Sequence, residues 1–375
     1  MTEKGKIKVI YVISRIDYAL AFDWVEKYLD KNKFDLHFVF LNPFTPKLHE
    51  LFLERGVKSY YVKFNSKSDY PKVAFQILKL FLKIKPSVIH THLIDACLTA
   101  MPVAFLLRIK KRIYTRHHST YHFDYFPHAV KYDRLINFLS TKIIAISKNV
   151  SNVLLNLEKV PAEKVQIVYH GFELDKFVQV DEIIVEKLKL QYVPNNNKPV
   201  IGVISRFTEW KGVQFIIPAF KKILQEYPEA YIVLANAHGD MQDEINKQLL
   251  DLPSNSYTTI KFEKELYALY KLFDVFVHVP IDEKSEAFGQ TYVEALAAGI
   301  PSVFTLSGIA SEFIVDKKNA IVVDYKNAEM IYSGIKMILN DDHLKESLIT
   351  NGREDVFKLF GIKEMIKSLE GVYES

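Results

Sequence analysis

Two cations lie close together in a segment that could hold an anion. The segment reads Ser205-Arg206-Phe-Thr-Glu-Trp-Lys211-Gly212, after an apolar run and before a helical pattern. Arginine can bind two phosphate oxygens at once and lysine adds a point charge. The free N–H groups at the start of the next helix also favour an anion. The spacing therefore suits a diphosphate, although two solvated loop cations remain the simpler alternative.

Two glutamates eight positions apart form a second candidate group. The segment reads Glu286-Ala-Phe288-Gly289-Gln290-Thr291-Tyr-Val-Glu294-Ala-Leu-Ala-Ala-Gly299-Ile-Pro301. We predict a short helix over 289–298 that ends at Gly299. Its first N–H groups would be free to bind phosphate or sugar oxygens. Carboxylates accept hydrogen bonds from hydroxyls, which suits a sugar and a ribose, and Glu294 needs a partner because its neighbours are apolar.

Adjacent histidines form a third group. His117 and His118 are followed by Ser-Thr-Tyr-His122. Side chains of neighbouring residues on an extended segment point to opposite sides, so we predict no metal site here. We expect His117 to contact a substrate, and a hydrogen-bonded loop histidine is the alternative.

Length and composition limit the class of protein. The chain has 375 residues, enough for two domains, and 49% of them are hydrophobic, as in globular proteins. Cys97 is the only cysteine, which excludes an intramolecular disulfide and a thiolate zinc site and indicates a reducing compartment. The start of the chain does not resemble a signal peptide. Its longest weakly polar stretch, 94–107, is too short to cross a bilayer.

The charge is unevenly distributed along the chain. Residues 1–170 carry 27 Lys and Arg against 14 Asp and Glu, whereas residues 171–375 carry 22 against 31. A basic N-terminal half indicates an anionic partner such as a nucleic acid, an acidic lipid surface or a phosphorylated ligand. We favour the lipid surface, because 106–113 and 79–85 are basic and apolar and 121–126 is aromatic. No nucleic-acid-binding module is recognisable.

The elements that must position these residues alternate between strand and helix. We predict strands at 8–13, 34–41, 58–62, 87–90, 112–115, 142–146, 199–204, 230–235, 274–278 and 300–304. Helices are predicted between them, and 344–375 reads as helical with breaks at Gly352, Gly361 and Gly371. This pattern is typical of an α/β protein with two doubly wound parallel sheets. A Pro- and Asn-rich segment, 190–199, indicates a loop or linker.

The chain resembles a known family in these same segments. Glu286 to Pro301 resembles the Glu-x7-Glu signature of the family 4 retaining glycosyltransferases, and Ser205 to Gly212 resembles their diphosphate clamp. Weaker similarities occur at Ser87–His92, Tyr114–His117, Ala145–Ser147, Tyr169–Phe177 and Ser311–Ile314. The chain is most similar to members that build bacterial surface polysaccharide and lipopolysaccharide.

The resemblance implies the GT-B fold, in which two Rossmann-like domains face a central cleft. The expected boundaries are an acceptor-binding domain at 1–178 and a donor-binding domain at 179–355. A C-terminal helix, 356–375, would cross back to the first domain. The implied reaction is the transfer of a hexosyl-type sugar from a nucleoside diphosphate sugar to a glycan or lipid-linked acceptor, with retention of configuration.

On the donor side, the resemblance implies that Arg206 and Lys211 hold the leaving diphosphate. Glu286 would bind hydroxyls of the donor sugar, and Glu294 would bind the ribose. Further donor contacts would come from Ser205, Phe288, Gly289, Gln290 and Thr291. No Asp-x-Asp motif occurs, so we expect Arg and Lys to replace a divalent ion, with no metal and no other cofactor.

On the acceptor side, His117 would lie across the cleft beside the donor sugar. Arg15, His118 and His92 are the other candidates. The chain departs from the family here, because the usual glycine pair after the first strand is replaced by Ser14-Arg15-Ile-Asp, where Arg15 could substitute.

Two other functions remain open from the sequence. A sugar-nucleotide epimerase of the same fold could use His117 and Asp95 as acid and base. A non-catalytic protein that binds a nucleotide or sugar would keep the donor residues without turnover. For the transferase, we expect a cytoplasmic protein with peripheral contact to the inner face of the membrane through its N-terminal domain.

Overall fold

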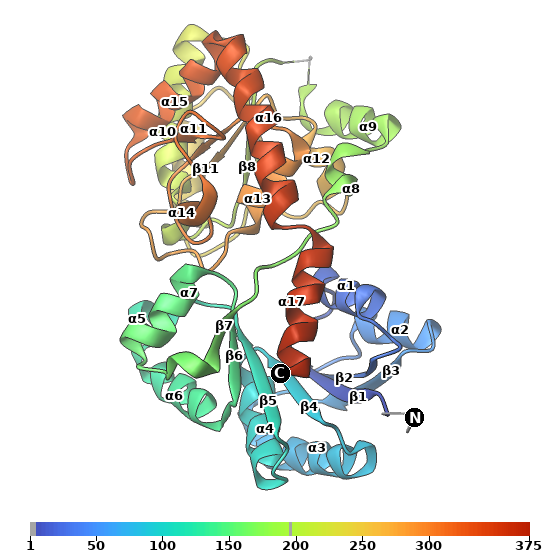
Figure 1. The fold of residues 1–375 in the computed structure, drawn as a ribbon. Coiled ribbons are helices and arrows are strands. Elements are labelled where there is room, and N and C mark those ends of the chain that lie inside the picture. Colours follow the sequence, from blue (N-terminus) through green and yellow to red (C-terminus); the bar gives the residue numbers. More distant parts are fainter. Residues whose placement is uncertain (1–4, 195–196) are drawn as a thin grey trace. The chain divides into compact units, whose positions relative to one another are not determined.

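The structure, a computed structural model, describes residues 5–194 and 197–375. The chain forms two compact units (Figure 1). Unit 1 runs to Gly171 and includes Ile362–Ser375, and unit 2 is Phe172–Gly361. The units thus divide at 171/172 and 361/362, where we predicted 178/179 and 355/356. The predicted linker at 190–199 lies inside unit 2, and its residues 195–196 are outside the described residues, as are residues 1–4 of the basic start of the chain.

Unit 1 contains a seven-stranded parallel sheet in the order β3-β2-β1-β4-β5-β6-β7. The strands are β1 (Ile7–Ser14), β2 (Phe34–Asn42), β3 (Lys58–Lys63), β4 (Val88–His92), β5 (Lys111–Arg116), β6 (Lys142–Ala145) and β7 (Val165–Ile167). The helices are α1 (Leu20–Tyr28), α2 (Lys47–Glu54), α3 (Tyr70–Ile84), α4 (Ile94–Leu106), α5 (Tyr121–Tyr125), α6 (Val130–Leu139), α7 (Lys148–Asn152) and α17 (Ile362–Glu374). Short turns are η1 (Lys67–Asp69), η2 (Pro127–Ala129), η3 (Val153–Leu157) and η4 (Ala162–Lys164).

Unit 2 contains a six-stranded parallel sheet in the order β10-β9-β8-β11-β12-β13. The strands are β8 (Val200–Ile204), β9 (Tyr231–Ala235), β10 (Tyr257–Ile260), β11 (Val275–His278), β12 (Ser302–Phe304) and β13 (Ile321–Val322). The helical elements are α8 (Asp175–Val178), α9 (Glu182–Tyr192), η6 (Glu209–Lys211), α10 (Val213–Glu226), α11 (Gln242–Leu250), α12 (Leu266–Tyr270), α13 (Gln290–Ala298), α14 (Ala310–Phe313), α15 (Ala328–Asn340) and α16 (Asp342–Leu359).

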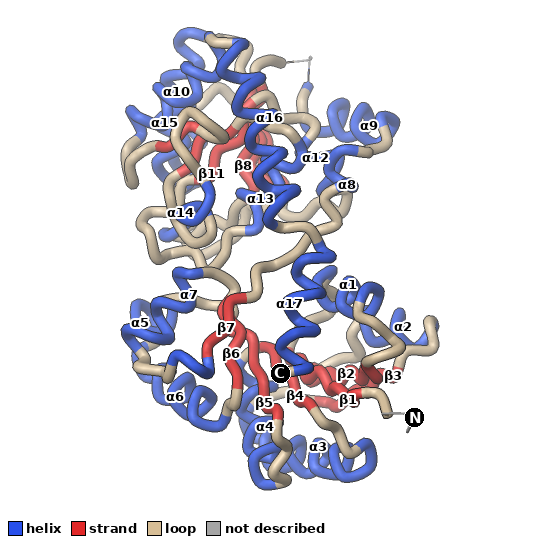
Figure 2. Tube along the Cα trace, in the orientation of Figure 1, coloured by secondary structure: helices blue, strands red, loops and turns tan. Residues whose placement is uncertain are grey.

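Each unit is doubly wound, as predicted. Figure 2 shows the strands of each sheet between layers of helices. In both sheets the strand order reverses beside the first strand, β1 or β8, and the loops at the carboxyl ends of the strands next to this point are where ligands bind in such folds. The sheet core packs against α3 and α4 in unit 1, and against α10 and α15 in unit 2.

The last helix, α17, belongs to unit 1. Tyr373 is fully buried there, and its hydroxyl lies 2.7 Å from Nδ1 of His90 on β4. Lys111 at the start of β5 donates to the carbonyl oxygen of Tyr373 at 2.6 Å. The chain therefore returns to the unit in which it began.

Two predicted helix breaks were wrong. Gly352 lies inside α16, and Gly371 lies inside α17. Gly352 is there for packing, because a Cβ at this position would come within 2.9 Å of Leu296 and 3.1 Å of the carbonyl oxygen of Asn319. Gly361, the third predicted break, does separate the two helices.

Among the described residues, no helix combines the length and the apolar character needed to cross a bilayer.

Candidate active site

The loop after β8 places the two donor-side cations. Gly212 ends the short turn η6 and begins α10 with a φ of +73°. A Cβ there would lie 1.9 Å from the carbonyl oxygen of Val279, so only glycine lets this loop lie against the loop after β11. Trp210 ties the two loops together, because its carbonyl accepts the Ile281 N–H at 3.1 Å. Lys211 is thereby fixed beside the residues that follow β11.

Glu286 lies at the centre of a buried polar cluster. Lys211 Nζ donates to its Oε1, and Nε2 of His278, the last residue of β11, lies 3.1 Å from the same oxygen. Its backbone N–H donates to Oγ of Ser307 at 3.1 Å. Burial acts to raise the pKa of Glu286, but the Lys211 charge and the His278 contact outweigh it and hold the pKa far below its usual value. The side chain is therefore an ionised acceptor at neutral pH.

Helix α13 begins directly after this cluster. Its N-cap, Gly289, has a φ of +84°, and the exposed Gln290 starts the helix. The first N–H groups of a helix have no intrahelical partner and carry its positive end. Within the described residues, Oγ1 of Thr291 is buried and makes no hydrogen bond. Phe288 is buried, and its carbonyl accepts the Ile309 N–H at 2.9 Å, which fixes the entry to the helix.

Glu294 lies one turn into α13 and is buried. The partner that its apolar setting required is Tyr270 of α12, whose hydroxyl donates to Oε2 at 2.8 Å. Burial raises the pKa of Glu294 to about 7, and the Tyr270 hydrogen bond only partly offsets this. The two glutamates of the pair therefore differ at neutral pH, since Glu286 is ionised while Glu294 is near its midpoint.

Arg206 differs from Lys211 in being exposed. Its guanidinium lies 5.6 Å from the ring centre of Trp210, in a cation–π position. Ser205 is buried before it, with its backbone N–H donating to Ala235 on β9 at 2.9 Å. Among the described residues, Arg206 contacts the Trp210 ring and makes no ion pair, which leaves its N–H groups available to an anion.

In unit 1, Arg15 lies directly after β1, where the resemblance implies glycine. It keeps a glycine-like backbone, with a φ of +54°. Its Nε donates to Oδ2 of Asp95 at 2.6 Å, and Tyr70 donates to the other oxygen at 2.6 Å. Both oxygens of Asp95 are therefore engaged, which leaves this carboxylate poorly suited to act as a proton carrier.

His117 is paired with His92 at the carboxyl ends of β5 and β4. Its Nε2 lies 3.0 Å from Nδ1 of His92. His90 and His170 lie beside them around a small apolar pocket. Burial lowers the pKa of His117 to about 4, and those of His90 and His170 to about 3. These imidazoles are neutral at pH 7, so His117 can exchange hydrogen bonds with a hydroxyl but is not a proton donor there.

His118 has a different partner from His117. Its Nε2 lies 3.4 Å from Oδ2 of Asp133 on α6, and Nδ1 of His122 lies 2.7 Å from the same oxygen. Burial lowers the pKa of His118 to about 4. Arg15, His117 and His118 all line one cavity of about 370 Å³ within unit 1.

The structure therefore places the predicted residues in two groups, one in each unit. Unit 2 contains Ser205, Arg206, Lys211, Glu286, Phe288, Gly289, Gln290, Thr291 and Glu294, and unit 1 contains Arg15, His92, His117 and His118. His278 and Tyr270, the partners of the two glutamates, were not predicted as site residues from the sequence. His278 had a visible signal, a polar residue at the end of an apolar strand, whereas Tyr270 had none.

Comparison with known proteins identifies the family. The model of "Glycosyl transferases group 1" matches residues 185–355, and that of "Glycosyltransferase Family 4" matches residues 25–176. The chain belongs to the family 4 glycosyltransferases. The matches fall on unit 2 and unit 1 respectively, so both halves of this glycosyltransferase carry the family pattern.

Solved structures show the GT-B fold. A glycosyltransferase from Rickettsia africae is 20% identical, with a TM-score of 0.79, over 99% of this chain and 98% of its own. Anabaena HepE in complex with UDP is 17% identical, with a TM-score of 0.82, over 98% of this chain and all of its own. At these identities the likeness concerns the fold.

Curated relatives include enzymes of surface polysaccharide synthesis. Glycosyltransferase MJ1607 of Methanocaldococcus jannaschii is 29% identical over 66% of this chain and 63% of its own length. The capsular polysaccharide biosynthesis glycosyltransferase CapM of Staphylococcus aureus is 25% identical over 81% and 80%. The lipopolysaccharide core biosynthesis glycosyltransferase LpsE of Rhizobium meliloti is 28% identical over 43% and 46%. The match thus spans less than two thirds of MJ1607 and of LpsE.

Proposed function

We propose that this glycosyltransferase moves a hexose-type sugar from a nucleoside diphosphate sugar to a hydroxyl of a glycan or lipid-linked acceptor, with retention of configuration and without a metal ion. The observation that carries the proposal is the ionised, buried Glu286, which lies between Lys211 and His278 directly before the N-terminus of α13. This arrangement places a carboxylate that can accept hydrogen bonds from hydroxyls next to a site that can bind an anion. A sugar linked to a diphosphate requires both.

Each donor residue has a task that its environment supports. Glu286 accepts hydrogen bonds from hydroxyls of the sugar, and Glu294 accepts them from the ribose. Arg206 and Lys211 neutralise the diphosphate, together with the N–H groups that begin α13. Charge that develops on the leaving diphosphate is stabilised where donors are already aimed at it, which is the largest contribution in many enzymes. Two cations and a helix N-terminus can supply this without a divalent ion.

The transfer step needs no nucleophile from the protein. The bond between the anomeric carbon and the diphosphate oxygen breaks as the acceptor oxygen approaches the same face of the sugar. The acceptor hydroxyl passes its proton to the departing phosphate oxygen. His117, neutral at pH 7, would orient a hydroxyl by hydrogen bonding, and the unit 1 cavity that it shares with Arg15 and His118 would bind the acceptor.

The geometry gives no support to the epimerase alternative. An epimerase would need an acid and a base, for which His117 and Asp95 were the candidates. Asp95 is engaged by Arg15 and Tyr70, and the low pKa of His117 leaves it without a proton to donate at neutral pH. An assay for transfer or hydrolysis products distinguishes a transferase from a protein that only binds a nucleotide or sugar.

The comparisons suggest which substrates to test first. HepE has been solved with UDP and with UDP-glucose, and CapM and LpsE are named for capsule and lipopolysaccharide synthesis. UDP-sugars are therefore the first donors, and an acceptor from surface polysaccharide assembly is the first acceptor class.

The experiment is a thermal-stability panel of UDP-, GDP-, ADP- and dTDP-sugars, with and without EDTA, against EDTA-only baselines. A ligand at a hundredfold excess over its dissociation constant stabilises the folded state by about 2.7 kcal/mol. Stabilisation by one nucleotide series that EDTA does not change is expected. A shift that EDTA abolishes would contradict the metal-free donor site. Binding of a nucleotide sugar without any transfer or hydrolysis product would favour the binding protein.

We also propose that unit 1 contacts an anionic membrane surface at the amino end of its sheet. In the parallel fold, the C-terminal turns of α3, α4 and α6 lie at this edge. They present exposed apolar side chains there, namely Leu82, Phe105, Leu106 and Phe138. Lys83, Lys85, Arg108 and Lys110, which lie in or just after the last turns of α3 and α4, are exposed as well. An apolar and cationic surface of this kind suits an anionic bilayer.

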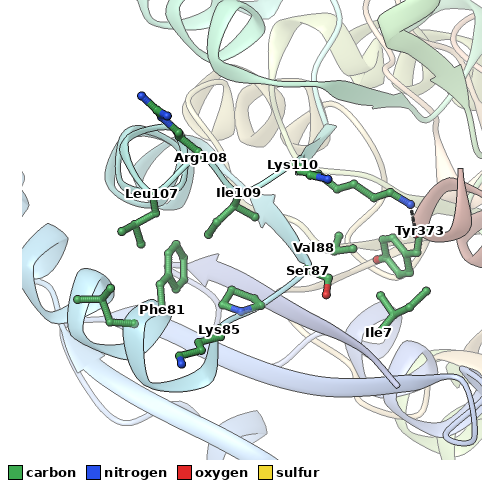
Figure 3. Close-up of a pocket in the computed structure, with 13 residues that line it drawn as sticks. Ile7, Phe81, Lys85, Ser87, Val88, Leu107, Arg108, Ile109, Lys110 and Tyr373 are labelled. Atoms are coloured by element: carbon green, nitrogen blue, oxygen red, sulfur yellow. Dashed lines mark hydrogen bonds between the residues drawn. The ribbon is translucent and has the colours of Figure 1, made fainter. Parts of the chain in front are cut away.

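A hollow of about 500 Å³ opens at this edge. Figure 3 shows Phe81, Leu107 and Ile109 along its apolar floor, with Arg108 pointing away from it. Lys85 and Lys110 are also exposed at its rim. The hollow can take an apolar group beside anionic headgroups, which is what an interfacial surface needs.

Co-sedimentation tests this surface with vesicles of phosphatidylcholine alone and of phosphatidylcholine mixed with phosphatidylglycerol. Only the mixed vesicles should bind the protein. Each cation near the surface contributes about 1 kcal/mol, so replacing four of them by serine removes up to about 4 kcal/mol and should weaken binding by up to about 1000-fold. The variant replaces Lys83, Lys85, Arg108 and Lys110, and a matched control replaces the exposed Lys247, Lys261, Lys317 and Lys326 of unit 2. Equal loss in both variants, or no binding, would contradict the proposal.

A further inference from the structure

Three side chains with metal-ligating atoms converge on one side of the unit 1 cavity. His118 follows β5, His122 lies in α5, and Asp133 lies in α6. One ligand atom of each lies within 4.8 Å of the other two. Both imidazoles face a single oxygen, Oδ2 of Asp133, at 3.4 and 2.7 Å. A cation placed among them would replace two histidine–carboxylate contacts with three ligand bonds.

We propose that His118, His122 and Asp133 form a binding site for a transition-metal ion of the zinc type. Two imidazoles and one carboxylate are a ligand set that suits zinc, whereas magnesium and calcium prefer sites made of oxygen alone. Three protein ligands leave a fourth position for water or a substrate oxygen. The site goes beyond the proposed glycosyl transfer, whose metal-free donor residues lie in unit 2.

The carboxylate ligand is held in place from behind. Nη1 of the buried Arg116 lies 3.0 Å from Oδ1 of Asp133, the oxygen that does not face the imidazoles. Nε of Arg116 donates to the backbone carbonyl of His118 at 3.0 Å, so the same guanidinium also fixes the loop that carries one histidine. Hydrogen bonds and ion pairs to a ligand residue orient it and tune the affinity of the site for the metal.

The charges around the site favour a cation. Arg116 also pairs with Glu158, which is buried, so this group contains two carboxylates and one guanidinium. The two imidazoles are less buried than the carboxylate, with 26% and 13% of their side-chain surface exposed against 2% for Asp133. An ion could therefore enter from the cavity side, where Arg15 and His117 also lie.

The test is metal binding by tag-free protein after EDTA treatment and desalting. Zinc is titrated calorimetrically, and Co²⁺ is added separately as a probe whose visible absorption reports the coordination geometry. We expect one zinc per chain and a Co²⁺ spectrum of a four- or five-coordinate site. His118→Ala and His122→Ala should each weaken zinc binding by about 100-fold or more. Loss of a residue that only supports a metal ligand weakens binding by about 10- to 100-fold, and loss of a ligand should cost at least as much. His343→Ala, an exposed histidine of unit 2, is the matched control and should bind as the wild type does.

The outcomes separate a built site from an adventitious one. Equal zinc affinity in the wild type and in a His118→Ala/His122→Ala double variant would overturn the proposal, as would the absence of binding. The histidine variants are preferred to Asp133 variants because removing Asp133 leaves the buried Arg116 charge with Glu158 alone. Far-ultraviolet circular dichroism verifies that each variant is folded. The readout does not depend on glycosyl transfer, so failure of this site leaves the proposed function standing.

Discussion

The ammonium group of Lys211 donates to Oε1 of Glu286 and so joins the loop after β8 to the segment that leads into α13. The two residues are 75 positions apart in the chain. Nε2 of His278 lies 3.1 Å from the same oxygen, so the carboxylate is held both from the loop after β8 and from the end of β11. Glu286 is thereby kept ionised although it is buried, and Lys211 is held at the place where we propose that the diphosphate binds.

Lys211→Ala should slow turnover more than it weakens nucleotide binding. Lys211 is proposed to stabilise charge that grows on the diphosphate as the sugar leaves, and removal of one such donor typically costs about 100- to 1000-fold in kcat. Steady-state kinetics with the donor series found by thermal stabilisation, together with calorimetric binding of the nucleotide, measures both effects. Lys222→Ala removes a half-buried lysine of α10 that pairs with Glu329, and it is the matched control. A kcat near that of the wild type would remove the leaving-group role of Lys211.

Arg206→Ala should weaken the binding of the nucleoside diphosphate but not that of the nucleoside. Arg206 is exposed and held over Trp210, so its proposed contact is with the phosphates alone. A hydrogen bond to a charged group contributes about 1.5–3 kcal/mol, which corresponds to an affinity loss of roughly ten- to a hundredfold. Arg206→Lys should keep part of the affinity, since it preserves a point charge but not the paired N–H groups. Equal losses for nucleoside and diphosphate would contradict the assignment.

Three of the four edge strands of the two described sheets were not predicted from the sequence. Nine of the ten predicted strands lie inside the two described sheets, where a strand buried on both faces is rich in apolar residues. The tenth, β3, is an edge strand that was predicted all the same. The three missed strands, β7, β10 and β13, are all edge strands. Their residues are partly exposed, as in β7, where none of the three is buried. An edge strand of two to four residues with mixed polarity leaves no pattern that distinguishes it from a loop.

In the site, residues that are close in the sequence could be predicted, whereas contacts between residues far apart in the sequence could not. Arg206 with Lys211, and Glu286 with Glu294, could be found because each pair lies in one short segment. The contact of Glu294 with Tyr270 joins separate helices, and no spacing in the sequence relates them. The same is true of Asp133, which brings His118 and His122 together from a separate helix.

Gly212→Ala should destabilise unit 2 and impair donor binding together. The residue has a φ of +73°, and a Cβ would meet the carbonyl oxygen of Val279 at 1.9 Å, so backbone must move. Strain of this kind costs about 1–3 kcal/mol, and the displaced loop carries Arg206 and Lys211. Thermal unfolding with and without nucleotide measures both losses. Gly56→Ala, at a φ of +72° with open space around it, is the matched control and should lose stability only. Wild-type nucleotide binding by Gly212→Ala would contradict the role of this turn.

Nucleotide affinity should fall as the pH is lowered through about 7. The pKa of Glu294 is about 7 because the carboxyl group is buried, and only its ionised form accepts hydrogen bonds from both ribose hydroxyls. If the protonated form binds poorly, the ionised fraction sets the affinity, which should drop about tenfold between pH 8 and pH 6. Calorimetric titration across this range measures the slope. Glu294→Gln has no carboxyl group at this position, so any pH dependence that it keeps comes from the phosphate of the ligand. Glu294→Ala should bind the nucleotide weakly at every pH in this range. An equal slope in the wild type and Glu294→Gln would contradict the ribose assignment.

Glu294→Gln should also make unit 2 more stable than the wild type, and increasingly so as the pH rises from about 4.5 to 7. The unfolded glutamate has a pKa of 4.5, whereas burial raises the folded value to about 7. Between these values the unfolded chain releases a proton that the folded chain keeps, so this group makes the wild type progressively less stable as the pH rises. Above pH 7 the difference is constant, at up to about 3 kcal/mol. The glutamine keeps an oxygen for the Tyr270 hydroxyl, so the comparison isolates the charge.

Urea unfolding of both proteins at pH 5 and pH 8 measures this difference, followed through the transition of unit 2 because a chain with two units need not unfold in one step. Tyr270→Phe provides an internal test. The Tyr270 hydrogen bond lowers the pKa of Glu294, so its removal should raise that pKa further and extend the pH range over which stability is lost. A stability difference between Glu294→Gln and the wild type that is the same at both pH values would show that Glu294 is not held near its midpoint by burial.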